Sequence, residues 1–237
     1  MNRLILLTFL VFGFWACSNK SENISSQQTN QQSDIESIDS EYDAINIQFN
    51  NPTIIDSSEW VLYPLTLEEF EKTEKGFKKS SSSKYGGKGG LYAYWNIAFY
   101  NTETNQTQLL SDSLKMLISR IVPSGSIICY SITTTDFNQD GKLYYDDPSY
   151  LFTSDLSGAG FKQISPNDFD VVNWTKIKNK ILIQTRRDSN NDKKFNFDDE
   201  IVLFVYDIEK QKTEPIFDQK FILKTKKLLE SQWSKQK

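Results

Sequence analysis

Acidic and amide side chains alternate along residues 136–147, which read Asp-Phe-Asn-Gln-Asp-Gly-Lys-Leu-Tyr-Tyr-Asp-Asp. Oxygen-bearing side chains stand at the first, third and fifth positions of this stretch, a glycine at the sixth and an acid at the twelfth. Calcium binds about six to eight hard oxygen atoms, and short side chains alternating on a tight loop supply several of them without strain. The spacing therefore predicts a cation site, whereas a lone match would be equally typical of a solvated polar turn.

The same spacing is found in the calcium loop of the EF-hand. Five groups are the predicted ligands of this first loop: the side chains of Asp136, Asn138, Asp140 and Asp147, and the backbone carbonyl of Lys142. Gly141 allows the positive φ angle that turns the chain around an ion. Leu143 supplies the apolar residue expected at position 8 of the loop.

Residues 188–199 repeat the scheme. The predicted ligands of this second loop are the side chains of Asp188, Asn190, Asp192 and Asp199, and the backbone carbonyl of Lys194. Lys193 replaces the glycine, so it must adopt a left-handed conformation at a cost of about 1 kcal/mol, and we expect the second calcium site to be weaker. An aspartate at position 12 of both loops resembles the dockerin form of the loop, and a strand is expected after each loop in place of a long helix.

The two loops belong to a longer duplication. Residues 136–166 align without a gap with residues 188–218, and the agreement continues beyond the loops. The pairs of identical residues beyond the loops are Leu151 and Leu203, Phe152 and Phe204, Asp155 and Asp207, and Ile164 and Ile216. A third, degenerate copy lies upstream, where residues 94–101 resemble residues 201–207.

Each copy has the same order of apolar, β-rich segments. The expected strands are 60–65, 94–100 and one ending at Leu110; 127–134, 150–156 and one ending at Ile164; and 181–185, 201–208 and one ending at Ile216. Segments 117–122 and 171–177 are expected to add a fourth strand between copies, and the tail around 224–229 a short closing helix or strand. Four antiparallel strands in each repeat are typical of a propeller blade, so we predict an all-β fold.

Residues 150–158 and 162–166 resemble the strand-turn-strand core of TolB-type β-propeller repeats, and Trp174-Thr175 before residues 180–183 is similar to their blade-opening segment. The Pro-Asp-Gly signature of that segment is absent. The resemblance covers residues 120–220 and implies three blades, or four with the ends, in an incomplete or small propeller. A β-sandwich or an open curved sheet is the alternative.

The N-terminus is typical of an exported protein. Residues 1–16 are predicted to be a signal peptide, because Arg3 precedes an apolar stretch too short to span a bilayer. The Ala16-Cys17 ending resembles the lipobox of bacterial lipoproteins, which implies lipidation of Cys17 and attachment to a membrane. An ordinary cleaved signal followed by a free cysteine is the alternative.

Ser18 after the cysteine resembles the outer-membrane signal of enterobacterial lipoproteins, and the side of that membrane is left open. Residues 17–44, dominated by Ser, Gln, Asn and acids, predict a flexible tether. The folded domain is then residues 45–237. Cys129 lies within an apolar run, which predicts a small buried side chain without a disulfide.

The sequence contains no histidine, which excludes Ser-His-Asp and Cys-His relays and His-based zinc sites. A net charge of -4 argues against a nucleic-acid partner. We therefore predict a calcium-stabilised, lipid-anchored envelope module that binds a protein or a glycan without catalysis. The alternative is a carbohydrate-active enzyme or another hydrolase with a carboxylate-only site.

Overall fold

The computed structural model describes residues 46–56, 58–66 and 93–234, and two further strands, 70–73 and 76–79, by their backbone alone. The predicted signal peptide and the whole of the predicted tether, Cys17 included, lie outside these residues, as does residue 45. No helix in the described part of the chain is long and apolar enough to cross a membrane.

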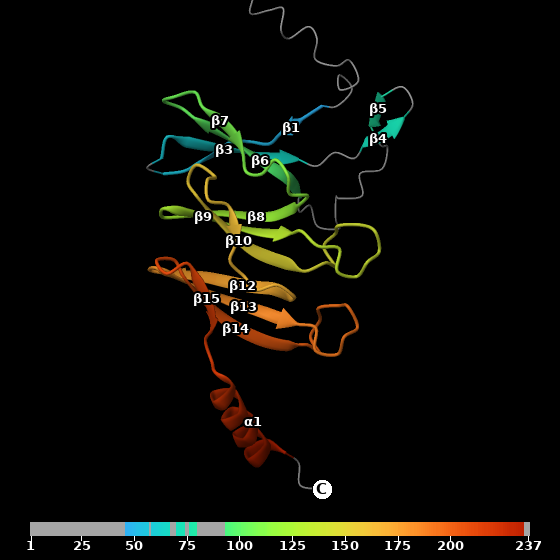
Figure 1. Ribbon diagram of the computed structural model, residues 1–237, viewed down its shortest axis with the longest axis vertical. Helices are drawn as coiled ribbons and strands as arrows, with labels where there is room; N and C mark the ends of the chain where they lie inside the picture. Colours follow the sequence, from blue (N-terminus) through green and yellow to red (C-terminus); the bar gives the residue numbers. More distant parts are fainter. Residues whose placement is uncertain (1–45, 57, 67–69, 74–75, 80–92, 235–237) are drawn as a thin grey trace, which may run out of the picture. The chain divides into compact units, whose positions relative to one another are not determined.

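The described strands fall into three consecutive modules (Figure 1). The first module contains β1 (Gln48–Phe49), β2 (Thr53–Ile54), β3 (Trp60–Thr66), β6 (Tyr94–Asn101) and β7 (Thr107–Leu109), and the hairpin β4 (Phe70–Thr73) and β5 (Gly76–Lys79) is inserted between β3 and β6. The middle module contains β8 (Leu117–Ser124), β9 (Ile127–Thr133), β10 (Ser149–Asp155) and β11 (Lys162–Gln163). The third contains β12 (Phe169–Ile177), β13 (Lys180–Arg187), β14 (Glu200–Asp207) and β15 (Lys212–Pro215), and is followed by the helix α1 (Gln219–Trp233).

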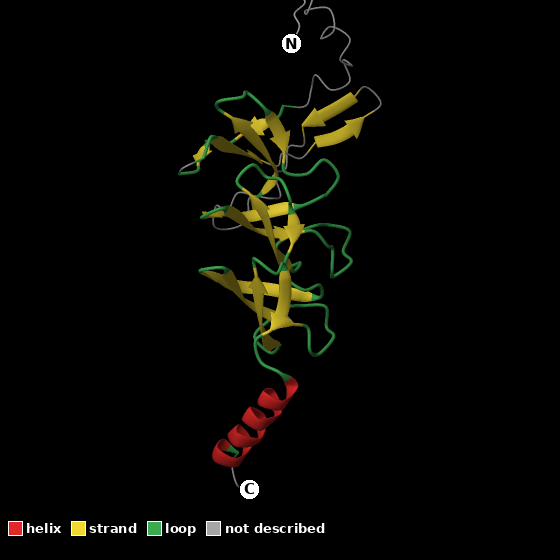
Figure 2. Cartoon of the chain, turned by 60° about the vertical axis from the view of Figure 1, so that its left-hand side comes forward, coloured by secondary structure: helices red, strands yellow, loops and turns green. Residues whose placement is uncertain are grey.

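Every strand pair in these modules is antiparallel, so the predicted all-β fold is confirmed (Figure 2). The middle and third modules each have four strands that pair in chain order, as predicted from the repeat. A single residue pair, Tyr94 with Ile118, joins the first and middle modules into one sheet. The propeller arrangement is not confirmed, because no ladder among the described strands pairs the third module with the first and the sheets stay open.

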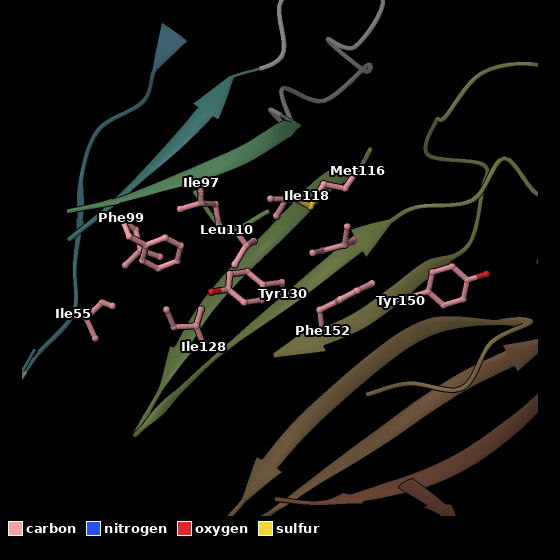
Figure 3. Packing of buried hydrophobic residues seen from close by; sticks show 12 residues of the cluster. Ile55, Ile97, Phe99, Leu110, Met116, Ile118, Ile128, Tyr130, Tyr150 and Phe152 are labelled. Atoms are coloured by element: carbon pink, nitrogen blue, oxygen red, sulfur yellow. The ribbon is translucent and has the colours of Figure 1, made fainter. Parts of the chain in front are cut away.

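The middle module is buried on both faces because successive side chains of a strand point to opposite sides. In β9, Ile128, Tyr130 and Ile132 enter a core shared with the first module, and Cys129 enters a core shared with the third. Figure 3 shows the first core, where Ile97 and Phe99 of the first module meet side chains of β9 and β10. Consecutive apolar residues of one strand therefore pack into two different cores, one on each face of the module.

Hydrogen bonds between modules accompany this packing. The Thr213 hydroxyl donates to the Ile164 carbonyl (2.5 Å), and the Lys162 ammonium donates to the Gln211 amide oxygen (2.8 Å). The backbone N–H of Ser149 donates to the carboxylate of Asp170 (3.0 Å). Burial raises the pKa of Asp170 above its ordinary value, opposed by this hydrogen bond and by the charge of Arg186.

The C-terminal segment, expected as a helix or a strand, is the helix α1. The Asp218 carboxylate caps it by accepting the N–H of Phe221 (2.7 Å), as aspartate does at helix N-termini. The rings of Phe217 and Phe221 stack across the cap with centroids 4.6 Å apart. None of the residues of α1 is buried, and the Lys226 ammonium of this helix forms an ion pair with Glu200 of β14 (3.2 Å).

Cys129 is free and buried, as predicted, and desolvation raises the pKa of its thiol from 9.0 to about 11. Because the thiolate is the reactive form, we expect the native thiol to react with a disulfide reagent at pH 8 at least about 100-fold more slowly than in the unfolded chain. The measurement is the labelling rate with and without denaturant in a Cys17→Ser chain. Equal rates in the two states would contradict the buried position of Cys129.

Candidate metal centre

The two acidic loops occupy equivalent places in successive modules. Loop 136–147 connects β9 to β10, and loop 188–199 connects β13 to β14. Figure 1 shows both loops projecting from the same end of their modules. Each loop is thus an insertion between two central, paired strands, and the strands fix where the loop begins and ends.

In the first loop, the predicted ligand side chains turn inward onto the loop's own backbone. One oxygen of Asp136 accepts the N–H of Asp140 (3.1 Å), and its other oxygen accepts the N–H of Gly141 (2.8 Å). The Asn138 oxygen accepts the same Asp140 N–H (2.9 Å), and Asp140 accepts the N–H of Lys142 (2.8 Å). These bonds bring the oxygens of positions 1, 3 and 5 toward the inside of one turn.

The second loop makes the same four backbone bonds at the corresponding positions. Asp188 accepts the N–H groups of Asp192 (3.2 Å) and Lys193 (3.0 Å). Asn190 accepts the N–H of Asp192 (3.0 Å), and Asp192 accepts the N–H of Lys194 (2.9 Å). Two segments with different residues at several positions therefore adopt one hydrogen-bond circuit.

The position-12 aspartates close both loops. Asp147 is buried, and its two oxygens accept the N–H groups of Phe137 (2.8 Å) and Tyr144 (2.9 Å). Asp199 is buried too and accepts the N–H groups of Ser189 and Asn196 (both 2.9 Å). The bonds from Asn196 and Ser189 lower the pKa of Asp199, because they favour its charged form. Each of these carboxylates ties the start of its loop to the end.

Left-handed backbone conformations shape the two turns. Gly141 has φ 84°, and Lys193, at the equivalent position, has φ 61°, which confirms the conformation predicted for this lysine. Gln139 (φ 63°) and Asn191 (φ 60°) share a second left-handed position in the two loops. The left-handed conformation is sterically unfavourable for a lysine but not for a glycine, so the second loop has more backbone strain than the first.

The apolar residues at position 8 have different surroundings in the two loops. Leu143 is buried in a small cluster with Ala93 and Leu117, which attaches the first loop to the scaffold. Phe195 in the second loop instead packs against Phe137 of the first, with ring centroids 4.9 Å apart. The sequence pattern identified both position-8 residues but not this difference.

The two loops contact each other, which their spacing in the sequence did not predict. Besides the ring contact, the Lys193 ammonium donates to the Gln139 side-chain oxygen (2.9 Å). A hollow of about 330 Å³ lies between the loops, and residues of both line it, together with Asp170 of β12. The sequence signal that could have suggested the contact is the pair Phe137 and Phe195, since each is a large apolar side chain in a mainly polar loop.

The chemistry available to each loop is that of hard oxygen ligands. No three Asp, Glu, Cys or His side chains in the described part of the chain converge closely enough to hold a metal as they stand. Carboxylates of like charge repel one another, and the predicted ligands Asp136, Asp140 and Asp147, like their counterparts in the second loop, accept backbone N–H groups. The circuit keeps the oxygens of positions 1, 3 and 5 on one turn.

The other matched acids of the repeat lie in turns. Asp155 accepts the N–H groups of Ser157 (2.8 Å) and Ala159 (2.9 Å). Asp207 accepts those of Glu209 (3.1 Å) and Lys210 (3.0 Å), and the Lys210 N–H lowers the pKa of its carboxyl. Such bonds are those of Asx turns, so these two residues shape strand connections.

Comparison with protein-family models and with curated proteins found no match. The resemblance of the strand pattern to TolB-type repeats therefore stays a resemblance. The geometry of the chain's own loops is what supports a functional assignment.

Proposed function

We propose that this chain is a calcium-stabilised β-repeat module, anchored to the bacterial outer membrane through lipid on Cys17, that binds a protein or a glycan without catalysis. The observation that carries the calcium assignment is the hydrogen-bond circuit shared by the two loops. The anchoring part of the proposal depends on the N-terminal sequence alone.

The circuit favours calcium binding because it organises the ligands in advance. The backbone bonds to Asp136 and Asp188 hold the turn of each loop closed, so little chain entropy is lost when an ion binds. The carboxylate at position 12 and the carbonyl at position 7 add oxygens from the far side of the loop. Calcium accepts such a flexible, oxygen-rich set, whereas magnesium requires a near-ideal octahedron.

A stabilising role follows from where the loops lie. Each loop contains four aspartates, namely Asp136, Asp140, Asp146 and Asp147 in the first and Asp188, Asp192, Asp198 and Asp199 in the second. Their mutual repulsion destabilises the closed loop, and a divalent cation would remove that repulsion. Since each loop joins two central strands, removing the repulsion would stabilise the sheet from which the loop projects.

The test is calcium titration of residues 45–237, followed by binding heat and by thermal unfolding. We expect two binding events, with dissociation constants of about 10⁻⁴ to 10⁻³ M and the weaker one in the second loop. Calcium at about 100 times a dissociation constant adds about 2.7 kcal/mol to the free energy of unfolding for each site. This corresponds to a rise in the melting temperature of about 5 to 10 °C.

Two double variants assign the binding events. Asp136→Ala with Asp140→Ala should remove the tighter event, and Asp188→Ala with Asp192→Ala the weaker one. Magnesium at equal concentration serves as the control for a nonspecific effect of charge. If calcium changes neither the binding heat nor the melting temperature of the parent fragment, the loops are acidic turns and the proposal is wrong.

A further inference from the structure

The helix α1 has an apolar stripe that is largely exposed. Its members recur at helical spacing and therefore share one side of the helix. The stripe consists of Phe221, Ile222, Thr225, Leu228, Leu229 and Trp233. Ile222 is half-buried, but four large apolar members have high exposed fractions: Phe221 (48%), Leu228 (52%), Leu229 (61%) and Trp233 (77%). A continuous exposed apolar surface of this kind marks an interaction site.

Polar groups on this side of the helix are few and do not keep the stripe in water. The Thr225 hydroxyl donates to the backbone carbonyl of Phe221 (3.0 Å), so it already has an acceptor inside the helix. Gln232 is the other polar residue on this side, and it is exposed in the last turn of the helix. The stripe can therefore enter an apolar layer at little cost in lost hydrogen bonds.

Lysines border the stripe along both edges. Lys224 lies three residues after Phe221 and four before Leu228, and Lys226 lies four residues after Ile222 and three before Leu229. Lys220 and Lys227 extend this basic side away from the stripe. The helix contains four lysines and one glutamate, whereas the whole chain has a net charge of -4. Positive charge is thus concentrated on α1 in a chain that is acidic as a whole.

The lysines of α1 are available to an external anion. In the part of the chain that the structure describes, no carboxylate forms an ion pair with Lys220, Lys224 or Lys227. Lys226 pairs with Glu200 (3.2 Å), but these side chains are 66% and 34% exposed. An ion pair this exposed contributes little to stability, so Lys226 can exchange its partner for another anion.

We infer that α1 binds the surface of an anionic phospholipid bilayer, with the stripe among the acyl chains and the lysines at the lipid phosphates. A helix with Trp, Phe and Leu on one side and lysines on the other lies in the plane of the membrane interface. Tryptophan favours the boundary between headgroups and acyl chains, which suits Trp233. Each lysine near an anionic surface strengthens binding about five-fold.

Charge and polarity favour lipid over the chain's own sheet as the partner of the stripe. The register places Gln184 opposite Leu203 and Arg186 opposite Ile201 on the exposed face of the third module. Polar groups therefore interrupt that face, and Arg186 adds to the positive charge that the lysines of α1 would meet there. An anionic bilayer supplies negative charge along both edges of the stripe and an apolar layer between them.

The experiment follows amide hydrogen exchange in α1 of the full chain. Exchange is compared without lipid, with vesicles of phosphatidylcholine, and with vesicles of phosphatidylcholine and phosphatidylglycerol in equal amounts. An exposed helix of this length is marginally stable in water, so its amides exchange fast. We expect the vesicles with phosphatidylglycerol to slow this exchange at least about 10-fold, because only the bound helix is protected. Phosphatidylcholine alone should slow it clearly less.

Leu229→Gln places a polar side chain in the stripe. Leu223→Gln is the matched control, because Leu223 is 55% exposed on the lysine-rich side of the same helix, three residues after Lys220 and four before Lys227. Glutamine and leucine have similar helix propensities, so both variants keep the helix. We expect the lipid-dependent protection to be lost in Leu229→Gln and retained in Leu223→Gln.

The contribution of charge is measured with Lys224→Gln combined with Lys227→Gln. This double variant should need about 25-fold more anionic lipid for half-maximal protection of α1, since two lysines are removed. Circular dichroism of each variant confirms that the sheets are retained.

Unchanged exchange in α1 with the anionic vesicles overturns the inference. So does equal protection by the two kinds of vesicle, or an equal loss of protection in Leu229→Gln and Leu223→Gln. Amides of α1 that are already protected without lipid, in a chain whose β13 and β14 exchange faster when α1 is removed, would place the helix on the sheet and also overturn it. The measurement is local to α1 and needs neither calcium nor lipid on Cys17, so this inference and the proposed function can fail independently.

Discussion

Replacing Asp147 by alanine is expected to lower the free energy of unfolding by about 2 to 4 kcal/mol without calcium, and to weaken calcium binding to the first loop at least about 100-fold. The reason is that this buried carboxylate accepts two backbone N–H groups, those of Phe137 and Tyr144, which lose this acceptor in the variant. Denaturant unfolding and calorimetric titration measure the two effects.

Asp146→Ala is the matched control, because it removes the neighbouring acid and the same formal charge. The Asp146 carboxylate accepts a side-chain bond from Asn138 (3.1 Å) at an exposed position. We expect this variant to unfold within about 0.5 kcal/mol of the parent and to keep its first calcium site. Equal losses in the two variants would mean that the loop responds to net charge alone, and the closing role of Asp147 would be wrong.

Gly158→Ala is expected to destabilise the fold by about 2 to 4 kcal/mol, through strain and overpacking together. Gly158, in the turn after β10, has φ 91°, and a Cβ atom there would lie 2.6 Å from the ring of Phe99. Phe99 is fully buried in the core between the first and middle modules, so its ring has little room to move. Thermal and denaturant unfolding of the variant measure the loss.

Gly160→Ala isolates the backbone part of this effect. Gly160 lies in the same turn with φ 67°, but a Cβ atom there would meet nothing within 4 Å. Its replacement should cost only about 1 kcal/mol, the usual penalty of a left-handed conformation. A Gly158→Ala variant no less stable than Gly160→Ala would show that the first and middle modules do not meet closely at Phe99.

Much of the fold could be predicted because its strands are long, apolar and repeated. Residues 127–134, 150–156 and 201–208 were expected as strands, and they form β9, β10 and β14 with nearly the same ends. The duplication helped because an apolar strand pattern that recurs in two aligned copies does not arise by chance. The left-handed conformation of Lys193 was also predictable, since the aligned residue is Gly141.

The remaining features depend on contacts that a linear pattern does not encode. Whether modules close into a ring depends on small rotations between sheets, and a blade-like sequence is compatible with both open and closed arrangements. The contact of Phe137 with Phe195 joins residues of two different modules, so no local spacing indicates it. The tail could not be assigned to a helix or a strand, because its apolar residues fill no core that would decide between them.

The middle module is covered on both faces, so the free energy of local unfolding differs from module to module. In repeat proteins, stability is approximately the sum of each unit's own contribution and those of its contacts with neighbours. The middle module has two such interfaces, whereas the first and third have one each. Unfolding should therefore begin at either end of the series and reach β9 last, with the slowest amide exchange around Ile128 and Tyr130. A protease would cleave the terminal modules first, and the strands of the middle module would resist cleavage longest among the described residues.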